Sequence, residues 1–71
     1  MTADEFDRME REAHVTAVAF DVLGGEEPAR RWLSAPNRGL GGETPLTLLD
    51  TAAGARQVVD ELHRLEYGIF S

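Results

Sequence analysis

The sequence of 71 residues contains neither cysteine nor lysine. Without cysteine the chain cannot form a disulfide or a thiolate metal site, two of the usual ways in which so short a chain is stabilised. A domain of this size buries only about 60% of the surface that its unfolded chain exposes. We therefore expect one domain at most, whose stability depends on packing and on association with another chain.

Clusters of positive charge are missing as well. Seven arginines stand against thirteen acidic residues, which leaves a net charge of −6. Arg30 and Arg31 form the densest basic spot, and Glu26 and Glu27 lie one turn away. Phosphate backbones are bound by basic clusters, so we expect this chain to make no direct contact with nucleic acid. An acidic surface instead suits a basic protein partner.

Long apolar runs are also absent. No run approaches the roughly 18 residues that a membrane-spanning helix needs. Residues 1–14 alternate acidic and basic side chains and do not resemble a signal peptide. These absences predict a cytoplasmic protein that does not contact a membrane.

The spacing of apolar residues predicts an all-α fold, a small bundle of about four helices: one long, two short and one medium. A capping box formed by Thr2 and Glu5 predicts the start of the long helix, and Gly24 and Gly25 predict its end. Its apolar stripe consists of Phe6, Met9, Ala13, Ala17, Phe20 and Leu23. No segment alternates apolar and polar residues over the length of a strand.

Valines widen this stripe in the second half of the long helix, at Val15, Val18 and Val22. A helix that is apolar over so wide an arc has to be covered on more than one side. A small monomer cannot supply that cover alone. We therefore expect a homodimer with these valines at or near the interface.

The rest of the chain predicts two short helices and one medium helix. Pro28 lies near the start of the first, and Thr44–Pro45 begins the second, which runs to Asp50. Between them, residues 37–43 form a glycine-containing loop in which we expect Leu40 to be buried. Thr51 caps the last helix, and Gly68 is expected just beyond its end. The stripe of this helix consists of Ala55, Val58, Val59, Leu62 and Leu65.

Residue pairs that could carry chemistry are sparse. Asp60 and His63 share a helix face, but a carboxylate metal site needs several such ligands on facing helices. The glycine-rich loop before Thr44 carries Glu43 where a phosphate-binding loop needs a lysine. No nucleophile set can be argued from local spacing. We therefore expect no enzyme activity, no catalytic residue, no metal and no cofactor.

Two aromatic features allow two interpretations each. Trp32 is either an interface hot spot or a core residue, and its position on a short helix favours the core. At the chain's end, Ile69 and Phe70 either fold back as a hydrophobic contact of the helix cap or occupy a partner's pocket. The residues alone do not decide between these two roles of the tail.

Three ordered blocks of residues resemble a known family. They are Ala29-x-x-Trp32-Leu33-x-x-Pro36-Asn37, then Leu40-Gly41-Gly42-x-Thr44-Pro45-Leu46-x-Leu48-Leu49, then Thr51-x-x-Gly54-x-x-x-Val58-x-x-x-Leu62-x-x-x-Glu66-Tyr67-Gly68. From about residue 16 to 68, the chain resembles the toxin-binding domain of Xre/MbcA/ParS-type antitoxins, the partners of RES-domain toxins. The motif residues expected to be structural are Trp32, Leu33, Leu40, Gly41, Gly42, Pro45 and Leu49.

The resemblance implies an antitoxin that neutralises a RES-like, NAD-consuming toxin by occluding its active site with the C-terminal tail. The toxin-binding residues would then be Arg64, Tyr67, Gly68, Ile69, Phe70 and Ser71. Most members of the family carry an N-terminal helix-turn-helix domain, but only about fifteen residues precede the matched region here. We thus expect residues 1–71 to form a single toxin-binding-like domain without a DNA-binding domain. The rival hypothesis is a structural dimerisation module that binds no toxin.

Overall fold

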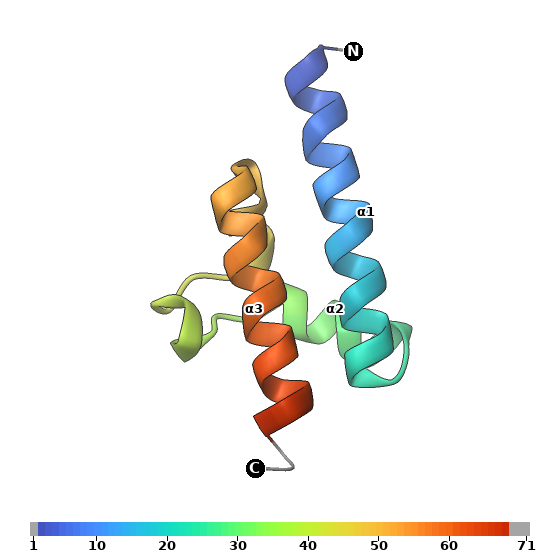
Figure 1. Cartoon of the computed structure of the whole chain (residues 1–71), viewed down its shortest axis with the longest axis vertical. Coiled ribbons are helices and arrows are strands. Elements are labelled where there is room, and N and C mark those ends of the chain that lie inside the picture. Colours follow the sequence, from blue (N-terminus) through green and yellow to red (C-terminus); the bar gives the residue numbers. More distant parts are fainter. Residues whose placement is uncertain (1, 69–71) are drawn as a thin grey trace.

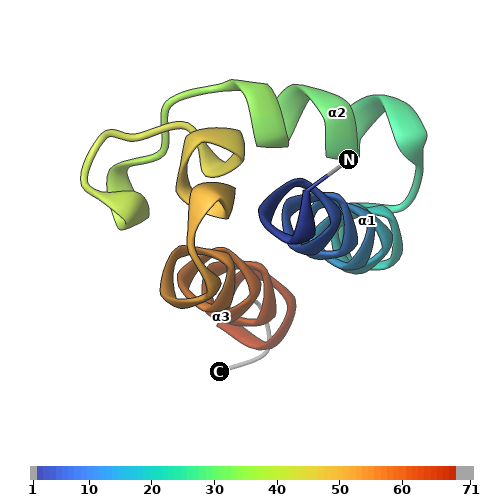
Figure 2. The ribbon, with the colours of Figure 1, turned by 90° about the horizontal axis from the view of Figure 1, so that it is seen from above.

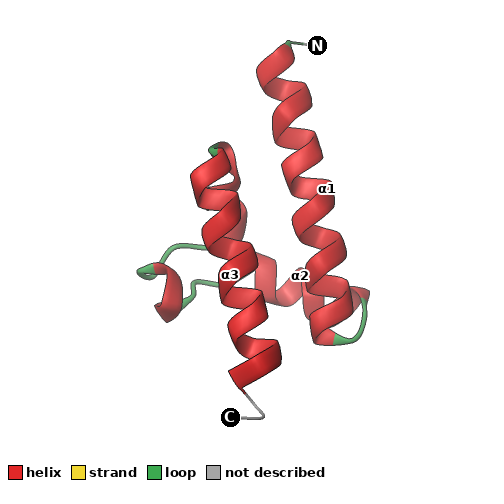
Figure 3. Cartoon of the chain, viewed as in Figure 1, coloured by secondary structure: helices red, strands yellow, loops and turns green. Residues whose placement is uncertain are grey.

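The computed structural model describes residues 2–68, which form a small all-α bundle, as the sequence predicts (Figures 1 and 3). Within that range no strand is present. The helices are α1 (Ala3–Leu23), α2 (Glu26–Ser34), η2 (Pro45–Asp50) and α3 (Ala52–Gly68), with a short 3-10 turn, η1 (Arg38–Leu40), between α2 and η2.

Local signals set the ends of the helices. At the start of α1, the amide of Glu5 donates to the Thr2 hydroxyl (3.2 Å) and the amide of Thr2 donates to the Glu5 carboxylate (3.3 Å). The helix ends at Gly24, whose φ of 84° is a left-handed conformation that glycine adopts without steric cost. Thr51 caps α3 by accepting from the amide of Gly54 (2.9 Å). Gly68, expected just beyond α3, is instead its last residue.

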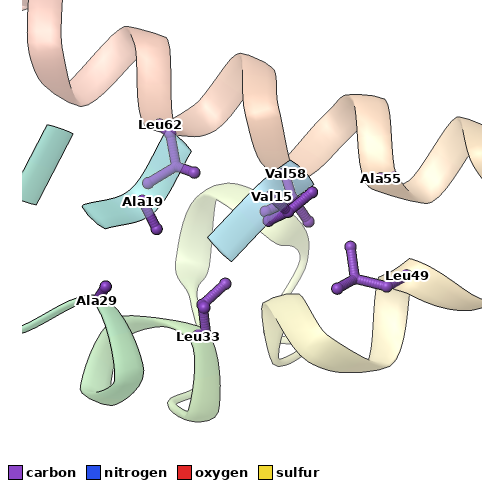
Figure 4. Close-up of a cluster of buried hydrophobic side chains, with 8 residues drawn as sticks. All are labelled: Val15, Ala19, Ala29, Leu33, Leu49, Ala55, Val58 and Leu62. Atoms are coloured by element: carbon purple, nitrogen blue, oxygen red, sulfur yellow. The ribbon is translucent and has the colours of Figure 1, made fainter. Parts of the chain in front are cut away.

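The core lies where α1 meets α2 on one side and α3 on another, with η2 packed against all three (Figure 2). Side chains converge on it from all four helices (Figure 4). The fully or nearly fully buried apolar residues are Val15, Ala19, Ala29, Leu33, Leu49, Ala55, Val58 and Leu62. The stripe predicted for α3 is confirmed, because three of its residues belong to this set.

The prediction for α1 is wrong about which side faces the core. Val15 is fully buried in the chain's own core and is therefore unavailable to an interface, while Val18 and Val22 are half-buried against that core. The stripe residues Phe6 and Met9 are instead 53% and 55% exposed. Both sides of α1 are apolar, so the packing of α2 and α3 decides which one is buried.

Residues 37–43 form a loop that is closed by its own hydrogen bonds. The side chain of Asn37 accepts from the amide of Gly39 (2.8 Å), and its carbonyl accepts from the amides of Leu40 (3.0 Å) and Gly42 (2.9 Å). The amide of Asn37 in turn donates to the carbonyl of Glu43 (3.1 Å). The sequence predicts a loop here, and the structure adds the turn η1 within it.

Two large motif residues are less buried than expected. Leu40 and Trp32 are both half-buried and pack against the edge of the core cluster. Leu40 belongs to η1, which packs on α3. Each side chain therefore seals a margin of the core rather than filling its centre.

Arginines from α1 fix η2 in place. The last carbonyls of a helix lack partners within the helix, and Arg11 donates to the carbonyls of Leu49 (2.8 Å) and Asp50 (3.0 Å). Arg8 forms an ion pair with the Asp50 carboxylate at 3.0 Å. The junction between η2 and α3 is thereby tied to the first half of α1.

Candidate partner interface

The last turns of α3 present an exposed face at one end of the molecule (Figure 1). The side chain of Arg64 is 73% exposed, and Tyr67 is 66% exposed. Leu62 faces the core from the same helix. The structure thus brings the predicted residues Arg64, Tyr67 and Gly68 together on one surface. Ile69, Phe70 and Ser71, the other predicted toxin-binding residues, lie outside the described residues.

The Tyr67 ring has a neighbour on its own helix. The rings of His63 and Tyr67 lie with their centroids 6.1 Å apart, tilted by 54°. Residues four apart on a helix lie side by side, so this contact restricts the rotamers of the exposed tyrosine. An exposed aromatic side chain that is already restricted loses less conformational entropy on binding, as is typical of interface hot spots.

Arg64 is held by a carboxylate that is largely buried. Glu61 is 8% exposed and is the one charged residue buried within the part of the chain that the structure describes. Its carboxylate lies 3.5 Å from the Arg64 guanidinium. That ion pair uses one nitrogen, so other guanidinium N–H groups stay free to face a partner.

Glu61 also locks the loop onto α3. Its carboxylate lies directly against Gly39, so a Cβ atom at position 39 would collide with it. Beside this contact is a hollow of about 450 Å³ lined by Gly39, Leu40, Gly41, Gln57, Asp60, Glu61 and Arg64. The candidate interface therefore comprises the end of α3 and the backbone of the η1 loop.

The residues that the sequence analysis predicts to be structural are, as a set, not part of this exposed surface. Pro45, Leu33 and Leu49 are buried. Gly41 and Gly42 adopt φ values of 70° and 85° at the turn of the loop. The structure thus places Pro45, Leu33 and Leu49 in the interior and the two glycines at the turn of the loop.

Sequence reasoning missed two features. Glu61 was not singled out, although it lies three residues after Val58 and one before Leu62, on the apolar side of the predicted helix. An acidic residue at such a position is the signal that could have found it. The exposure of Phe6, Met9 and Phe20 was missed because spacing alone does not tell which apolar side of α1 is covered.

Other polar residues of the described part of the chain gather away from the end of α3. Residues 2–68 contain no group of three or more histidine or acidic side chains placed to hold a metal ion. His14 and Glu10 line an open cleft of about 480 Å³ between α1 and α3, together with Arg56 and the apolar Ala55 and Val59. Among these residues no helix is both long and apolar enough to cross a membrane.

A family profile and three curated relatives indicate the same family. The profile of the antitoxin Xre/MbcA/ParS C-terminal toxin-binding domain matches residues 18–68. An antitoxin Xre of Yersinia enterocolitica is 42% identical over 99% of this chain and 48% of its own length. The antitoxin Xre of Pseudomonas putida is 43% identical over 96% of this chain and 43% of its own length. A third, from Photorhabdus laumondii, is 42% identical over 99% of this chain and 48% of its own.

The chain thus spans under half the length of these relatives. The matched region contains the whole of the exposed face on α3 and the η1 loop. No solved structure matches the chain significantly.

Proposed function

The chain belongs to the family of Xre/MbcA/ParS C-terminal toxin-binding domains, and on this basis we propose that it neutralises a RES-like, NAD-consuming toxin. In this proposal, the tail formed by Ile69, Phe70 and Ser71 occludes the toxin's active site. The exposed end of α3 forms the contact beside it. The observation that carries the proposal is that the family match ends at Gly68, where α3 presents Arg64 and Tyr67 to solvent.

The chemistry of the tail suits a pocket that holds NAD. Ile69 and Phe70 would each contribute roughly 1.5–3 kcal/mol if fully buried in the toxin. The carboxylate of Ser71 would meet cationic groups that otherwise hold the phosphates of NAD, in a charge-assisted contact. Arg64 and Tyr67 would support the tail from the rim of the pocket.

Truncation tests the occlusion directly. Deleting Ile69 to Ser71 should weaken the complex by about two to four orders of magnitude and restore toxin activity in proportion. The melting temperature of the antitoxin alone should stay within error, because the core lies elsewhere. A matched variant, Ile69→Ser with Phe70→Ser, keeps the length and the carboxylate, and so separates the apolar contribution from the charged one. Unchanged inhibition by the truncated chain would rule out occlusion by the tail.

The identity of the toxin needs a separate experiment. Co-expression with the product of the adjacent gene, followed by pull-down, should recover a complex, and the free toxin should lower cellular NAD. If no toxin co-purifies and NAD is unchanged, the alternative of a dimerisation module without a toxin partner is favoured.

We also infer that the chain forms a homodimer. A domain this small gains little from its own core, and α1 leaves large apolar side chains exposed, among them Phe6, Met9 and Phe20. Because Val15 is buried, the interface that the sequence analysis expects has to lie on the other side of α1.

A further inference from the structure

The exposed side of α1 carries an unbroken heptad pattern. Its residues alternate in spacings of three and four, as in the seam of a coiled coil. We call this set the outer row; it consists of Phe6, Met9, Ala13, Thr16 and Phe20. All five are exposed, and Leu23, the next position of the pattern, is half-buried. The outer row lies beside the face of α1 that carries the core residues Val15 and Ala19, roughly 110° around the helix from them.

Two hollows lie beside the outer row between Met9 and Phe20. One hollow of about 350 Å³ is lined by Met9, Glu12, Ala13 and Thr16. A second of about 220 Å³ lies between α1 and α2, with Thr16 and Phe20 on one wall and Ala29 and Leu33 on another. The two hollows adjoin at Thr16 and Glu12, and charged residues, among them Glu12 and Arg30, border their apolar surface. Small residues at the middle of the outer row allow another helix to approach closely.

Charge along α1 is distributed unevenly. The first half carries the acidic residues Asp4, Glu5, Asp7, Glu10 and Glu12, whereas residues 13–23 carry Asp21 alone. Of the two arginines in that first half, Arg8 is paired with Asp50 and Glu12, and Arg11 is bound to carbonyls. Two copies aligned in parallel would place their acidic halves side by side, which like-charge repulsion disfavours. Antiparallel copies would place each acidic half against a half with one acid.

We propose that the outer row binds the outer row of a second copy in an antiparallel helix pair. In this arrangement each layer joins an a position of one helix to a d position of the other. Met9 then contacts Phe20 of the second copy, Ala13 contacts Thr16, and Phe6 contacts Leu23.

The pairing has a consequence for toxin binding, and this part rests on the proposed function. α1 and α3 run in the same direction, and α3 ends at one pole of the molecule (Figure 1). Inverting the second copy places its α3 end at the opposite pole. The two toxin-binding ends then point away from each other, and a dimer holds two toxin molecules in a 2:2 complex.

Sedimentation or light scattering tests the pairing. Phe20→Glu should raise the dimer dissociation constant at least about a hundredfold, because the change occurs twice in each dimer. Phe20 is 51% exposed in the single chain, so the fold should survive, as circular dichroism can check. Ala53→Glu is the matched control, since it adds the same charge at an exposed site of α3 and should leave the dimer intact. A native chain that stays monomeric at millimolar concentration, or a Phe20→Glu variant that dimerises normally, would overturn the proposal.

Orientation can be tested with introduced thiols, because the native chain has no cysteine. A mixture of Met9→Cys and Phe20→Cys chains should cross-link to each other, whereas each alone should not. Two copies of position 9 in the antiparallel register are separated by eleven residues along the helix, or roughly 16 Å. Efficient self-linking of Met9→Cys chains would instead indicate a parallel pair and contradict the proposal.

Stoichiometry separates the pairing from the toxin-binding proposal. With a co-purified toxin, the native chain should give a 2:2 mass and Phe20→Glu a 1:1 mass with inhibition retained. A native 1:1 complex would overturn the opposed arrangement of the binding ends. Absence of any toxin complex would refute the proposed function, while the result of the dimer measurement would stand on its own.

Discussion

At the scale of single residues, Gly39 and Glu61 constrain each other although no sequence pattern links them. One sits at the first turn of the loop and the other on the apolar side of α3, and the carboxylate fills the place of a Cβ atom. The φ angle of Gly39 is negative, so its backbone conformation does not itself require glycine. Position 39 requires glycine only because the Glu61 carboxylate leaves no room for a Cβ atom.

Gly39→Ala should therefore destabilise the protein by roughly 1–3 kcal/mol, the usual range for overpacking. Thermal or urea unfolding measures this change. In the double variant Gly39→Ala with Glu61→Ala the collision is gone, so the two effects should be strongly non-additive. Additive losses would mean that the two side chains do not meet.

Arg64 should matter for binding far more than for folding. The Arg64 side chain is 73% exposed, and glutamine keeps an N–H donor for the Glu61 carboxylate, so Arg64→Gln should change stability by less than about 1 kcal/mol. Binding of the toxin should weaken measurably by calorimetry or surface plasmon resonance. Arg30→Gln, which removes an exposed ion pair on α2 instead, is the matched control. Equal effects of the two substitutions on toxin affinity would contradict a role for Arg64 at the interface.

At the scale of the helices, the start of α3 depends on a glycine that helix propensity alone would disfavour. A Cβ atom at Gly54 would collide with the carbonyl of Leu48, which is backbone and cannot move aside cheaply. Gly54→Ala normally stabilises a helix by about 1 kcal/mol. Here we expect the opposite sign, a loss of at least about 1 kcal/mol in chemical unfolding. Ala53→Gly, one residue away and exposed, should cost about 1 kcal/mol through propensity alone. A stabilised Gly54→Ala variant would refute the close approach.

The tie between α1 and η2 predicts unequal roles for two arginines. Arg11 donates two hydrogen bonds to main-chain carbonyls, one of them partly buried, so Arg11→Ala should cost about 1.5–3 kcal/mol. Arg8→Ala breaks exposed ion pairs and should cost less than about 1 kcal/mol. Equilibrium unfolding of the two variants compares them directly. Similar losses would show that the carbonyl contacts contribute little.

The bounds of the helices follow from the sequence because their causes are local. The capping pair Thr2 and Glu5, Gly24 and Thr51 each act within a few residues, and each behaves as predicted. The orientation of α1 does not follow, since Val15 and Phe20 stand on two sides that are similarly apolar. The environment of Glu61 depends on Gly39, more than twenty residues earlier in the chain, so a local sequence pattern cannot predict it.

The same limit applies to Trp32. Its half-buried position reduces the cost expected for Trp32→Ala below the 3–5 kcal/mol that is usual for a fully buried aromatic. For the candidate interface, the sequence indicated Arg64 and Tyr67 through the family resemblance. Their shared exposure depends on the orientation of α3, which is set by the burial of Leu62 and Val58 in the core.

At the scale of the whole molecule, the chain is elongated, with extents of 42 × 24 × 18 Å. An elongated chain of this size has much surface for its volume, so association should contribute to its stability. Because folding and pairing are linked, the melting temperature of the native chain should rise with concentration over the micromolar range. The melting temperature of the Phe20→Glu variant should be independent of concentration. A native melting temperature without concentration dependence would count against a dimer.

The contact between Gly39 and Glu61 also bears on how relatives of this chain can diverge. A side chain longer than glycine at position 39 fits only if position 61 shortens, and a glutamate at position 61 restricts position 39 to glycine. The two positions should therefore change together in aligned relatives, although they lie in different elements. Each accepted exchange would reshape the loop beside Arg64, so a single coupled substitution would offer a route by which one antitoxin comes to prefer a different toxin.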